Sequence, residues 1–400
     1  MAFGTIEQAL ADLRAGKFVV VADDEDRENE GDLVCAAERI TPEMVNFMMR
    51  AKGMICLALT NEIADRMDLP LMGREQTDAF RTAYTITIDA APQHGVTTGI
   101  SAADQAATIR VAVDPRSTPA DLRRPGHVHP LRARTGGVLQ RTGHTEAAVD
   151  LARAAGLTPA GVICEILNDD GTTAKRPQLE VFAREHGLTF ITVAQLVAWR
   201  LRTERLVRRV ADARLPTDFG EFRIVGYEND VDRAEHVALV YGHLGDGEDV
   251  LVRIHSKCLT GDTFHSLRCD CRWQLHEAMR RVAERGRGVV VYLDQEGRGI
   301  GLLNKLKAYG LQDAGKDTVE ANEALGFQAD LRNFGIGAQV LLDLGVRSIR
   351  VMTNNPKKVV GVEGYGLRIT GTERIQAPET AENAEYLRVK REKLGHLKAL

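Results

Sequence analysis

Short apolar segments recur along this sequence, and stretches with the spacing of amphipathic helices lie between them. Apolar runs of this length are typical of buried strands. The clearest are residues 18–22, 54–59 and 288–293. Residues 348–352 are also predicted as a strand, and an alternating pattern predicts another at residues 84–88. Helical patterns cover residues 5–16, 41–52, 302–311 and 338–344. Strands that alternate with helices predict an α/β or α+β fold class, in which each domain is a mixed sheet packed with helices.

The length of the chain predicts more than one domain. Its 400 residues fit two or three domains, at roughly 150 residues each. Residues 199–210 hold five arginines, which could form a patch for polyanions. We favour a solvated helix that joins two domains, because the run is short and the net charge of the chain is −4. We therefore expect domains at residues 1–204 and 205–400.

The composition also excludes several classes of partner. A net charge of −4 indicates no general affinity for nucleic acid or for an anionic membrane. No apolar stretch is long enough for a transmembrane helix, and the N-terminus does not have the pattern of a signal peptide. Disulfide scaffolds are short and secreted, so Cys35, Cys56 and Cys164 are interpreted as buried thiols. We expect a cytoplasmic protein that binds neither nucleic acid nor membrane.

An acidic segment directly follows the first apolar run. Residues 23–32 carry seven carboxylates, which repel each other unless cations neutralise them. Mg²⁺ prefers oxygen ligands of this kind and keeps waters that substrate oxygens can replace. A solvated acidic loop is the alternative, and it is the commoner one for an arbitrary run of charge. The abrupt junction between strand and cluster favours a metal site only in part.

Two histidines and one glutamate are the other candidates in the first half. His127 lies in an Arg-Pro-Gly-His segment. His144 precedes a helix that Thr145 could cap, where backbone N–H groups and the helix dipole suit a phosphate, and it could bind a metal or move protons. Glu165 follows the apolar residues 161–164 and could stand at the end of a strand. Singly, each histidine is more often structural, and Glu165 is as often a surface acid.

Three cysteines cluster in the second half with the spacing C-x10-C-x-C, at Cys258, Cys269 and Cys271. Three thiolates fit a tetrahedral zinc whose fourth position is open to water, which is the catalytic pattern. A structural zinc with a fourth protein ligand fits the spacing equally well. The candidates for that ligand are His255, His265 and His276. Zinc-bound water suggests attack on a nucleobase carbon, but the chain lacks the H-x-E and P-C-x-x-C pairing of zinc deaminases.

Two further segments of the second half suit an anion. Residues 296–301 follow a strand, are rich in glycine and open a helix, so they could cradle phosphates. They are not the G-x-G-x-x-G of dinucleotide sites. Residues 353–358 follow another strand and offer Lys357 and Lys358. An ordinary turn with solvated lysines is the commoner alternative for such a segment in isolation.

Taken in order, the motifs of the first half resemble 3,4-dihydroxy-2-butanone 4-phosphate synthase over residues 5–200. The matching segments are DDEDRENEGD at 23–32, GVTTGISAAD at 95–104, RPGH at 124–127, GHTEA at 143–147 and CE at 164–165. One departure is Gln105, where the family usually has arginine. The resemblance implies that this half converts ribulose 5-phosphate to 3,4-dihydroxy-2-butanone 4-phosphate and formate.

This resemblance also implies a metal site and a set of substrate contacts. Glu28 and His144 would hold a pair of Mg²⁺ or Mn²⁺ ions, which act as Lewis acids on the sugar carbonyl and hydroxyls. His127 and Glu165 would be the catalytic groups, with Glu165 placed to move protons. The implied substrate-binding residues are Arg27, Glu28, Asp32, Arg141, Thr142, Gly143, His144, Thr145 and Glu165.

The second half resembles GTP cyclohydrolase II over residues 208–396. The matching segments are RIHS at 253–256, CLTGD at 258–262, LRCDC at 267–271, QEGR at 295–298, DTVEAN at 317–322, LGF at 325–327 and TNNPKK at 353–358. The resemblance implies hydrolysis of the imidazole ring of GTP, which yields formate, pyrophosphate and a diaminopyrimidine ribosylamine phosphate. Because dimers are common in both families, we expect a homodimer.

The second resemblance implies one Zn²⁺ and three further catalytic groups. The implied zinc ligands are Cys258, Cys269 and Cys271. Asp330 would be the general base, Arg332 would act at the α-phosphate as nucleophile or charge clamp, and Tyr309 would assist near the zinc-bound water. Glu296 and Gln274 would read the guanine edge. The implied GTP-binding residues are Arg253, Ile254, His255, Ser256, Lys257, Gln274, Glu296, Gly297, Arg298, Thr318, Thr353 and Lys358.

Four positions depart from the second family's pattern. They are Lys257 for glutamate, Arg272 for glycine, Asp294 for arginine and Phe334 for tyrosine. Asp294 matters most, because the loss of a cation near a triphosphate weakens anion binding. The departures motivate an alternative in which only the synthase is active and the second half is a regulatory module. A zinc-stabilised binding protein is a further alternative. We prefer a bifunctional enzyme, since the cysteines and the implied catalytic residues are present.

Overall fold

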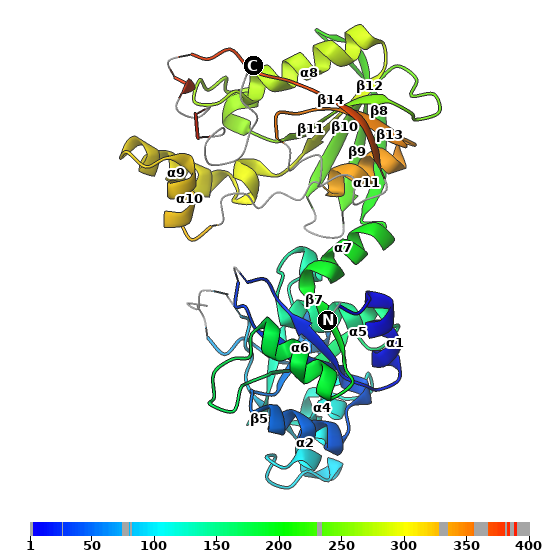
Figure 1. Cartoon of the computed structure of the whole chain (residues 1–400), viewed down its shortest axis with the longest axis vertical. Helices are drawn as coiled ribbons and strands as arrows, with labels where there is room; N and C mark the ends of the chain where they lie inside the picture. The colour runs from blue at the N-terminus through cyan, green and yellow to red at the C-terminus, as the bar shows by residue number, and fades with distance from the viewer. Residues whose placement is uncertain are drawn as a thin grey trace. The chain divides into compact units, whose positions relative to one another are not determined.

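The computed structural model describes residues 3–25, 27–73, 80, 82–229, 234–327, 335–355, 367–380, 382–384 and 388–389, except the side chains of residues 298 and 323. The chain divides into two units, Met1–Arg200 and Leu201–Leu400. Each unit is built on its own seven-stranded sheet packed with helices (Figure 1). The predicted fold class is therefore confirmed. Within the described ranges, no helix is both long and apolar enough to cross a membrane.

The first unit has a mixed sheet with the strand order β4-β5-β3-β6-β2-β1-β7. Its strands are β1 (Val19–Ala22), β2 (Gly31–Ala36), β3 (Cys56–Leu59), β4 (Ile88–Ala90), β5 (Leu122–Arg132), β6 (Ala160–Glu165) and β7 (Thr189–Thr192). Successive side chains of a strand point to opposite faces, so Val20 joins one hydrophobic core and Val21 the other. β1 and β3 are buried on both faces and apolar throughout, which is why the sequence predicted them.

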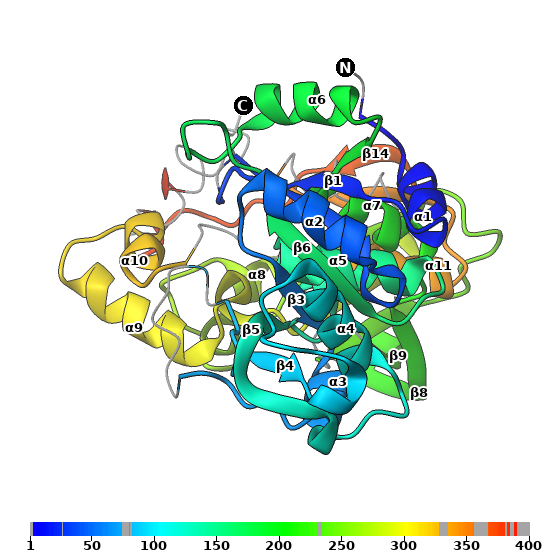
Figure 2. The ribbon, with the colours of Figure 1, turned by 90° about the horizontal axis from the view of Figure 1, so that it is seen from below.

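Helices cover both faces of this sheet. On one face lie α2 (Pro42–Ala51), α3 (Asn61–Arg66), α4 (Ala102–Val113) and α6 (Arg176–Glu185). On the other lie α1 (Ile6–Arg14), α5 (His144–Ala154) and α7 (Val193–Thr203). Figure 2 shows α2 and α4 close together, and the two helices are in contact. Thr41 is the N-cap of α2, where its side chain accepts the N–H of Met44, and proline begins the helix.

Three sequence predictions of local structure are wrong. Residues 84–88 form isolated bridges at Tyr84 and Thr85, and β4 begins only at Ile88. The hydroxyl of Thr87 accepts the N–H of Gly126 at 3.0 Å, so a side chain replaces a ladder bond there.

The other two errors concern helix ends. Residues 199–210 are not one helix, because α7 ends at Thr203 and β8 begins at Val207, where pairing with β9 outweighs the local pattern. Gly143 and not Thr145 is the N-cap of α5, and it provides no side-chain hydrogen bond. The first N–H groups of α5 therefore lack a side-chain cap and are available to a ligand.

The second unit has a mixed sheet with the strand order β14-β13-β11-β12-β10-β9-β8. Its strands are β8 (Val207–Thr217), β9 (Gly220–Asn229), β10 (Glu235–Tyr241), β11 (Val250–Ser256), β12 (Gly288–Leu293), β13 (Ser348–Met352) and β14 (Arg368–Glu373). Its helices are α8 (Cys271–Arg285), α9 (Leu302–Asp313), α10 (Thr318–Ala324) and α11 (Gly335–Asp343). Leu251 packs in the core with α8, whereas Ile254 lies against α11 at Gly337, so these helices cover opposite faces.

Candidate active sites

The sheet of the first unit brings three of the predicted site residues to one end. Asp32 on β2 is paired with Glu165 on β6. β3 lies between β6 and β5, and its register places Glu165 and His127 level with Met54. The N–H of Met54 donates to Glu165 Oε2 at 2.8 Å, which fixes this carboxylate at the end of its strand. Strand register therefore gathers residues from distant parts of the sequence, between positions 32 and 165.

His144 joins this group from the N-terminus of α5. Its Nδ1 lies 3.7 Å from Glu28 Oε2 and 3.8 Å from Asp32 Oδ1. Asp23, Glu28 and His144 offer ligand atoms that all lie within 4.8 Å of one another. His144 Nε2 and Asp32 Oδ1 are buried without a hydrogen-bond partner among the described residues. Buried polar atoms of this kind need a partner, so the cluster is suited to an ion and its waters.

The charges of this cluster are strongly coupled. Burial raises the pKa of Asp32 to about 7, although the nearby His144 lowers it. Burial alone would raise the pKa of Glu28, but hydrogen bonding to His144 and the charge of Arg27 bring it down to about 2. Burial lowers the pKa of His144, but the charge of Asp32 and the hydrogen bond with Glu28 raise it to about 9. A divalent cation would take the place of that proton and satisfy the same carboxylates.

Two guanidinium groups lie beside the uncapped end of α5. A Cβ at Gly143 would come within 2.3 Å of Arg141 Nη1 and 3.0 Å of Arg27 Nη2, so a larger residue there would displace these guanidinium groups. Arg27 is anchored by an ion pair with Asp23 at 2.8 Å, and Arg141 by one with Glu146 at 2.7 Å. Guanidinium groups beside free backbone N–H groups suit a phosphate.

His127 is oriented by a residue that the sequence did not indicate. Asp89 is buried, and its carboxylate accepts the backbone N–H of His127 at 3.0 Å. The other carboxylate oxygen lies 2.8 Å from His127 Nδ1. Because an ionised carboxylate only accepts, Nδ1 carries the hydrogen and Nε2 is left as the acceptor. Asp89 therefore holds the tautomer in which Nε2 can take a proton.

Asp89→Asn should impair the synthase reaction through His127. We expect kcat to fall about 100-fold with little change in KM, because the imidazole loses its fixed tautomer. Steady-state kinetics with ribulose 5-phosphate would measure this. Asp121→Asn is the matched control, since it removes a similar contact, 2.9 Å from His94 Nε2, outside the site. Equal effects of the two substitutions would contradict a positioning role for Asp89.

The three cysteines of the second unit converge around one point. Cys258 precedes a π-helical turn (η5, Leu259–Thr263), and Cys271 begins α8. The three sulfurs lie within 4.8 Å of one another, and those of Cys258 and Cys269 are 3.7 Å apart. A Cβ at Gly261 would come within 2.7 Å of Cys269 Sγ and 3.0 Å of Cys258 Sγ. Glycine thus leaves room for the sulfurs, and three convergent thiols fit a zinc ion.

The histidine alternatives for a fourth zinc ligand are not favoured by this geometry. In the described part of the chain, no histidine joins the three sulfurs within 4.8 Å. His255 Nε2 lies 3.2 Å from Asp262 Oδ2, and His276 packs against the ring of Phe219. His265 is exposed. The arrangement therefore favours three protein ligands and an open fourth position, which is the catalytic pattern.

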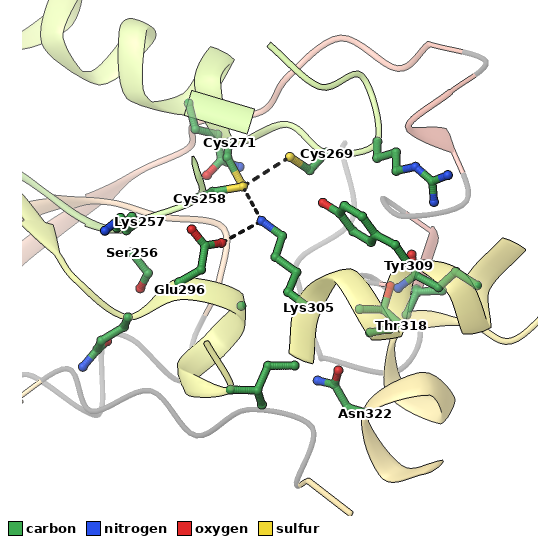
Figure 3. A pocket seen from close by; sticks show the side chains of 18 of the residues that line it. Ser256, Lys257, Cys258, Cys269, Cys271, Glu296, Lys305, Tyr309, Thr318 and Asn322 are labelled. Carbon is green, nitrogen blue, oxygen red and sulfur yellow. Dashed lines mark hydrogen bonds and ion pairs between the residues drawn. The ribbon is translucent and has the colours of Figure 1, made fainter. Parts of the chain in front are cut away.

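A cavity of about 420 Å³ lies against the cysteines (Figure 3). It brings together most of the predicted GTP-binding residues. Those that line it are Arg253, His255, Ser256, Lys257, Gln274, Glu296, Gly297, Thr318 and Thr353, together with Tyr309 and the three cysteines. Ile254 does not line it, because its side chain lies against Gly337. Asp330, Arg332, Phe334, Lys358 and the side chain of Arg298 lie outside the described residues.

The two residues predicted to read guanine are already held by the protein. Gln274 Nε2 donates to Asp270 Oδ2 at 2.6 Å, and its Oε1 accepts from the guanidinium of Arg253. Glu296 Oε2 accepts the N–H of Leu259 at 2.7 Å. Both side chains are therefore oriented before a ligand binds.

Tyr309 contacts Thr260, which follows Cys258 closely in the sequence, and two cations lie near its ring. Its hydroxyl is 3.0 Å from Thr260 Oγ1. The guanidinium carbon of Arg268 lies 4.9 Å from the ring centroid, and Lys305 Nζ lies 5.7 Å from it. Lys305 also lines the cavity, and no sequence pattern indicated it.

Two of the four departures face each other across the parallel strands β11 and β12. The last paired residues are Ser256 and Leu293, so Lys257 and Asp294 come next on each strand. Lys257 Nζ lies 3.1 Å from Asp294 Oδ1. The family's usual glutamate and arginine would give an ion pair of reversed sign at these positions. Lys257 lines the cavity, so a cation still stands at its edge. Nothing in the structure explains Arg272.

Lys257→Glu should weaken the use of GTP, because it places two carboxylates side by side at the cavity edge. We expect KM for GTP to rise about 30-fold with kcat little changed. Lys257→Glu combined with Asp294→Arg restores an ion pair and should recover most of the loss. Steady-state kinetics would measure both. Lys52→Glu is the control, since it breaks a surface pair of 2.8 Å with Asp169 in the other unit. A double variant as poor as the single one would contradict this account.

Two family models match the chain. The model of 3,4-dihydroxy-2-butanone 4-phosphate synthase matches residues 7–199, and the model of GTP cyclohydrolase II matches residues 208–376. A curated relative, Riboflavin biosynthesis protein RibBA of Salinispora arenicola, is 61% identical over 397 residues. That match covers 99% of this chain and 94% of the relative.

Solved structures resemble the chain as well. The crystal structure of RibBX, a two domain 3,4-dihydroxy-2-butanone 4-phosphate synthase from A. baumannii, is 37% identical with a TM-score of 0.73. That match covers 94% of this chain and 100% of the other. A synthase structure in complex with two magnesium ions is 42% identical with a TM-score of 0.49, and covers 50% of this chain and 98% of the other.

The fold and the two sites define a two-domain α/β enzyme with one oxygen-rich site and one thiol-rich site. The chain belongs to the family of bifunctional riboflavin biosynthesis proteins, which join 3,4-dihydroxy-2-butanone 4-phosphate synthase to GTP cyclohydrolase II. The alternative of a second half that has lost its activity is not supported, because the cyclohydrolase model and the full-length relative both cover it.

Proposed function

We propose that the chain carries its two reactions at the two separate sites described above. Residues 1–204 would convert ribulose 5-phosphate at the oxygen-rich site, and residues 205–400 would open GTP in the cavity beside the cysteines. One observation supports this proposal above all, which is that the two units gather different kinds of metal-binding side chain. One unit gathers carboxylates and imidazole, and the other gathers three thiols that line a cavity of about 420 Å³.

In the first unit, Glu28 and His144 are the proposed ligands of Mg²⁺ or Mn²⁺, and Asp23 is a further candidate. A bound divalent ion of this kind polarises a sugar carbonyl and its hydroxyls. His127 and Glu165 stand level across the sheet, so both can exchange protons with one bound sugar. The uncapped N-terminus of α5 would hold the phosphate. Arg27, Asp32 and residues 141–145 complete the proposed substrate site.

In the second unit, the three cysteines are the proposed ligands of one zinc ion. A bound zinc supplies a water of lowered pKa for attack on the base. Hydrogen bonds with Cys269 and Cys271, together with the ammonium of Lys305, lower the pKa of the Cys258 thiol, whereas contacts with Cys258 and burial raise the pKa of the other two thiols. A bound zinc would take all three as thiolates. Glu296 and Gln274 would read guanine. The proposed general base is Asp330. Arg332 would act at the α-phosphate, and Tyr309 would assist near the zinc-bound water.

Assays of each reaction on the purified full chain would test the proposal. Ribulose 5-phosphate should yield formate without pyrophosphate, and GTP should yield both products. Metal analysis should find one zinc, and up to two Mg²⁺ or Mn²⁺, per chain. Turnover of the sugar phosphate without any product from GTP would contradict the role of the second unit.

We also propose that the enzyme is a cytoplasmic homodimer. Dimers are common in both families, and the only partners required by the chemistry are its two small substrates. Sedimentation of the purified chain should give the mass of two chains. A single-chain mass at micromolar concentration would contradict the dimer.

A further inference from the structure

The ammonium group of Lys305 makes three contacts, which link α9 to Glu296 and to residues 258–263, the segment that begins at Cys258 and is called the thiol loop below. Its Nζ donates to Glu296 Oε1 at 2.7 Å and to Cys258 Sγ at 3.1 Å (Figure 3). It also donates to Thr260 Oγ1 at 2.9 Å. An ammonium has three donors, so these contacts use all of them. The side chain of Lys305 is only 12% exposed. The contacts are therefore shielded from water and worth more than a surface ion pair.

Glu296 is consequently held from two sides. Lys305 binds its Oε1, and the N–H of Leu259 binds its Oε2 at 2.7 Å. A carboxylate has about four lone-pair sites, so each oxygen keeps a site for a ligand. The N1–H and the 2-amino group of guanine lie side by side and match two carboxylate oxygens. Reading them requires the plane of the carboxylate to be fixed, which Lys305 and Leu259 together achieve.

We propose that Lys305 is a positioning residue of the GTP site, which fixes Glu296 against the thiol loop so that this carboxylate selects guanine. The inference rests on the proposed function of the second unit and deepens it by assigning base selection to an ion pair between α9 and the 296–299 turn. Protein acceptors already use the three donors of Lys305, so it acts through Glu296 and not on the substrate phosphates.

Lys305→Met tests this role when GTP is compared with inosine triphosphate, which lacks the 2-amino group. We expect kcat/KM for GTP to fall about 100-fold and that for inosine triphosphate to fall less than about 5-fold, so the preference for GTP is lost. Lys307→Met is the matched control, because Lys307 is exposed on the same helix, and it should change neither value. Equal losses with both nucleotides would overturn the proposal, whether or not zinc is retained in the same samples.

A double-mutant cycle with Glu296→Gln gives the second test. If Lys305 acts through Glu296, the double variant should be no worse than Glu296→Gln alone, whereas additive losses would overturn the proposal. The synthase activity of each sample reports that the chain is folded, and Lys305→Gln replaces Lys305→Met if the latter is insoluble. A wild-type chain that opens no GTP would refute the proposed function itself. If the wild-type chain opens GTP but Lys305→Met keeps the preference for GTP, only the role proposed for Lys305 is refuted.

Discussion

Cys269→Ser is expected to abolish the opening of GTP and to leave the synthase reaction unchanged. A serine hydroxyl stays protonated near neutral pH, so it cannot replace a thiolate ligand of zinc. We expect GTP turnover to fall about 1000-fold or more, because the activated water is lost with the metal. Formate and pyrophosphate released from GTP would measure the first effect, and formate from ribulose 5-phosphate the second.

The matched control for this experiment is Cys35→Ala. Cys35 is a buried thiol in the sheet of the first unit and lies in neither proposed site. Its substitution should keep the zinc content and the GTP activity. Two outcomes of Cys269→Ser would contradict the account. One is a variant that keeps zinc and GTP turnover, and the other is a variant that loses both reactions while it remains folded.

His144→Ala is expected to have the mirror-image effect, with loss of synthase activity and unchanged GTP opening. The imidazole contributes the orphaned Nε2 of the oxygen-rich cluster and stands at the uncapped start of α5. Its removal should weaken metal binding and take away the imidazole that lies 3.7 Å from Glu28 Oε2 and 3.8 Å from Asp32 Oδ1. We expect the turnover of ribulose 5-phosphate to fall about 1000-fold or more.

His94→Ala serves as the control for this substitution. His94 pairs with Asp121 at 2.9 Å and lies outside the proposed synthase site. The binding of Mn²⁺, followed by its paramagnetic signal, should weaken in His144→Ala and persist in His94→Ala. A His144→Ala variant that binds Mn²⁺ as tightly as the wild type would contradict the role of His144 as a ligand.

The sequence predicted the buried strands well and the segments beside them less well. The predicted strands at residues 288–293 and 348–352 correspond to β12 and β13 residue for residue, because strands covered on both faces are largely apolar. Residues 199–210 were wrongly predicted as one helix, because arginines also suit an exposed edge strand. In β8, Arg208 and Arg209 bind Glu228 and Asp343, partners that only the folded chain supplies.

The site residues also divide into those that a local sequence pattern indicated and those that it did not. The cysteine spacing and the acidic segment indicated the donors, because ligands that lie close together in sequence form recognisable patterns. Asp89 and Lys305 gave no signal of this kind. Asp89 meets His127 only through the pairing of β4 with β5. Lys305 differs from its exposed neighbour Lys307 only in the direction in which it points, which no local pattern records.

The lysine and aspartate at positions 257 and 294 show what a single residue cannot reveal. Considered alone, Asp294 suggested a weakened anion site. The register of β11 and β12 makes them one ion pair of reversed sign. Only the pairing of β11 with β12 shows that the two departures together reverse one ion pair.

The central claim is that three sulfurs hold a zinc ion whose fourth position is open. Zinc-edge X-ray absorption of the purified full chain tests it most directly. The account predicts three sulfur neighbours at about 2.3 Å and one oxygen neighbour at about 2.0–2.2 Å, which GTP or an analogue perturbs. A fourth protein ligand, seen as imidazole nitrogen with its outer-shell scattering and unaffected by nucleotide, would contradict it.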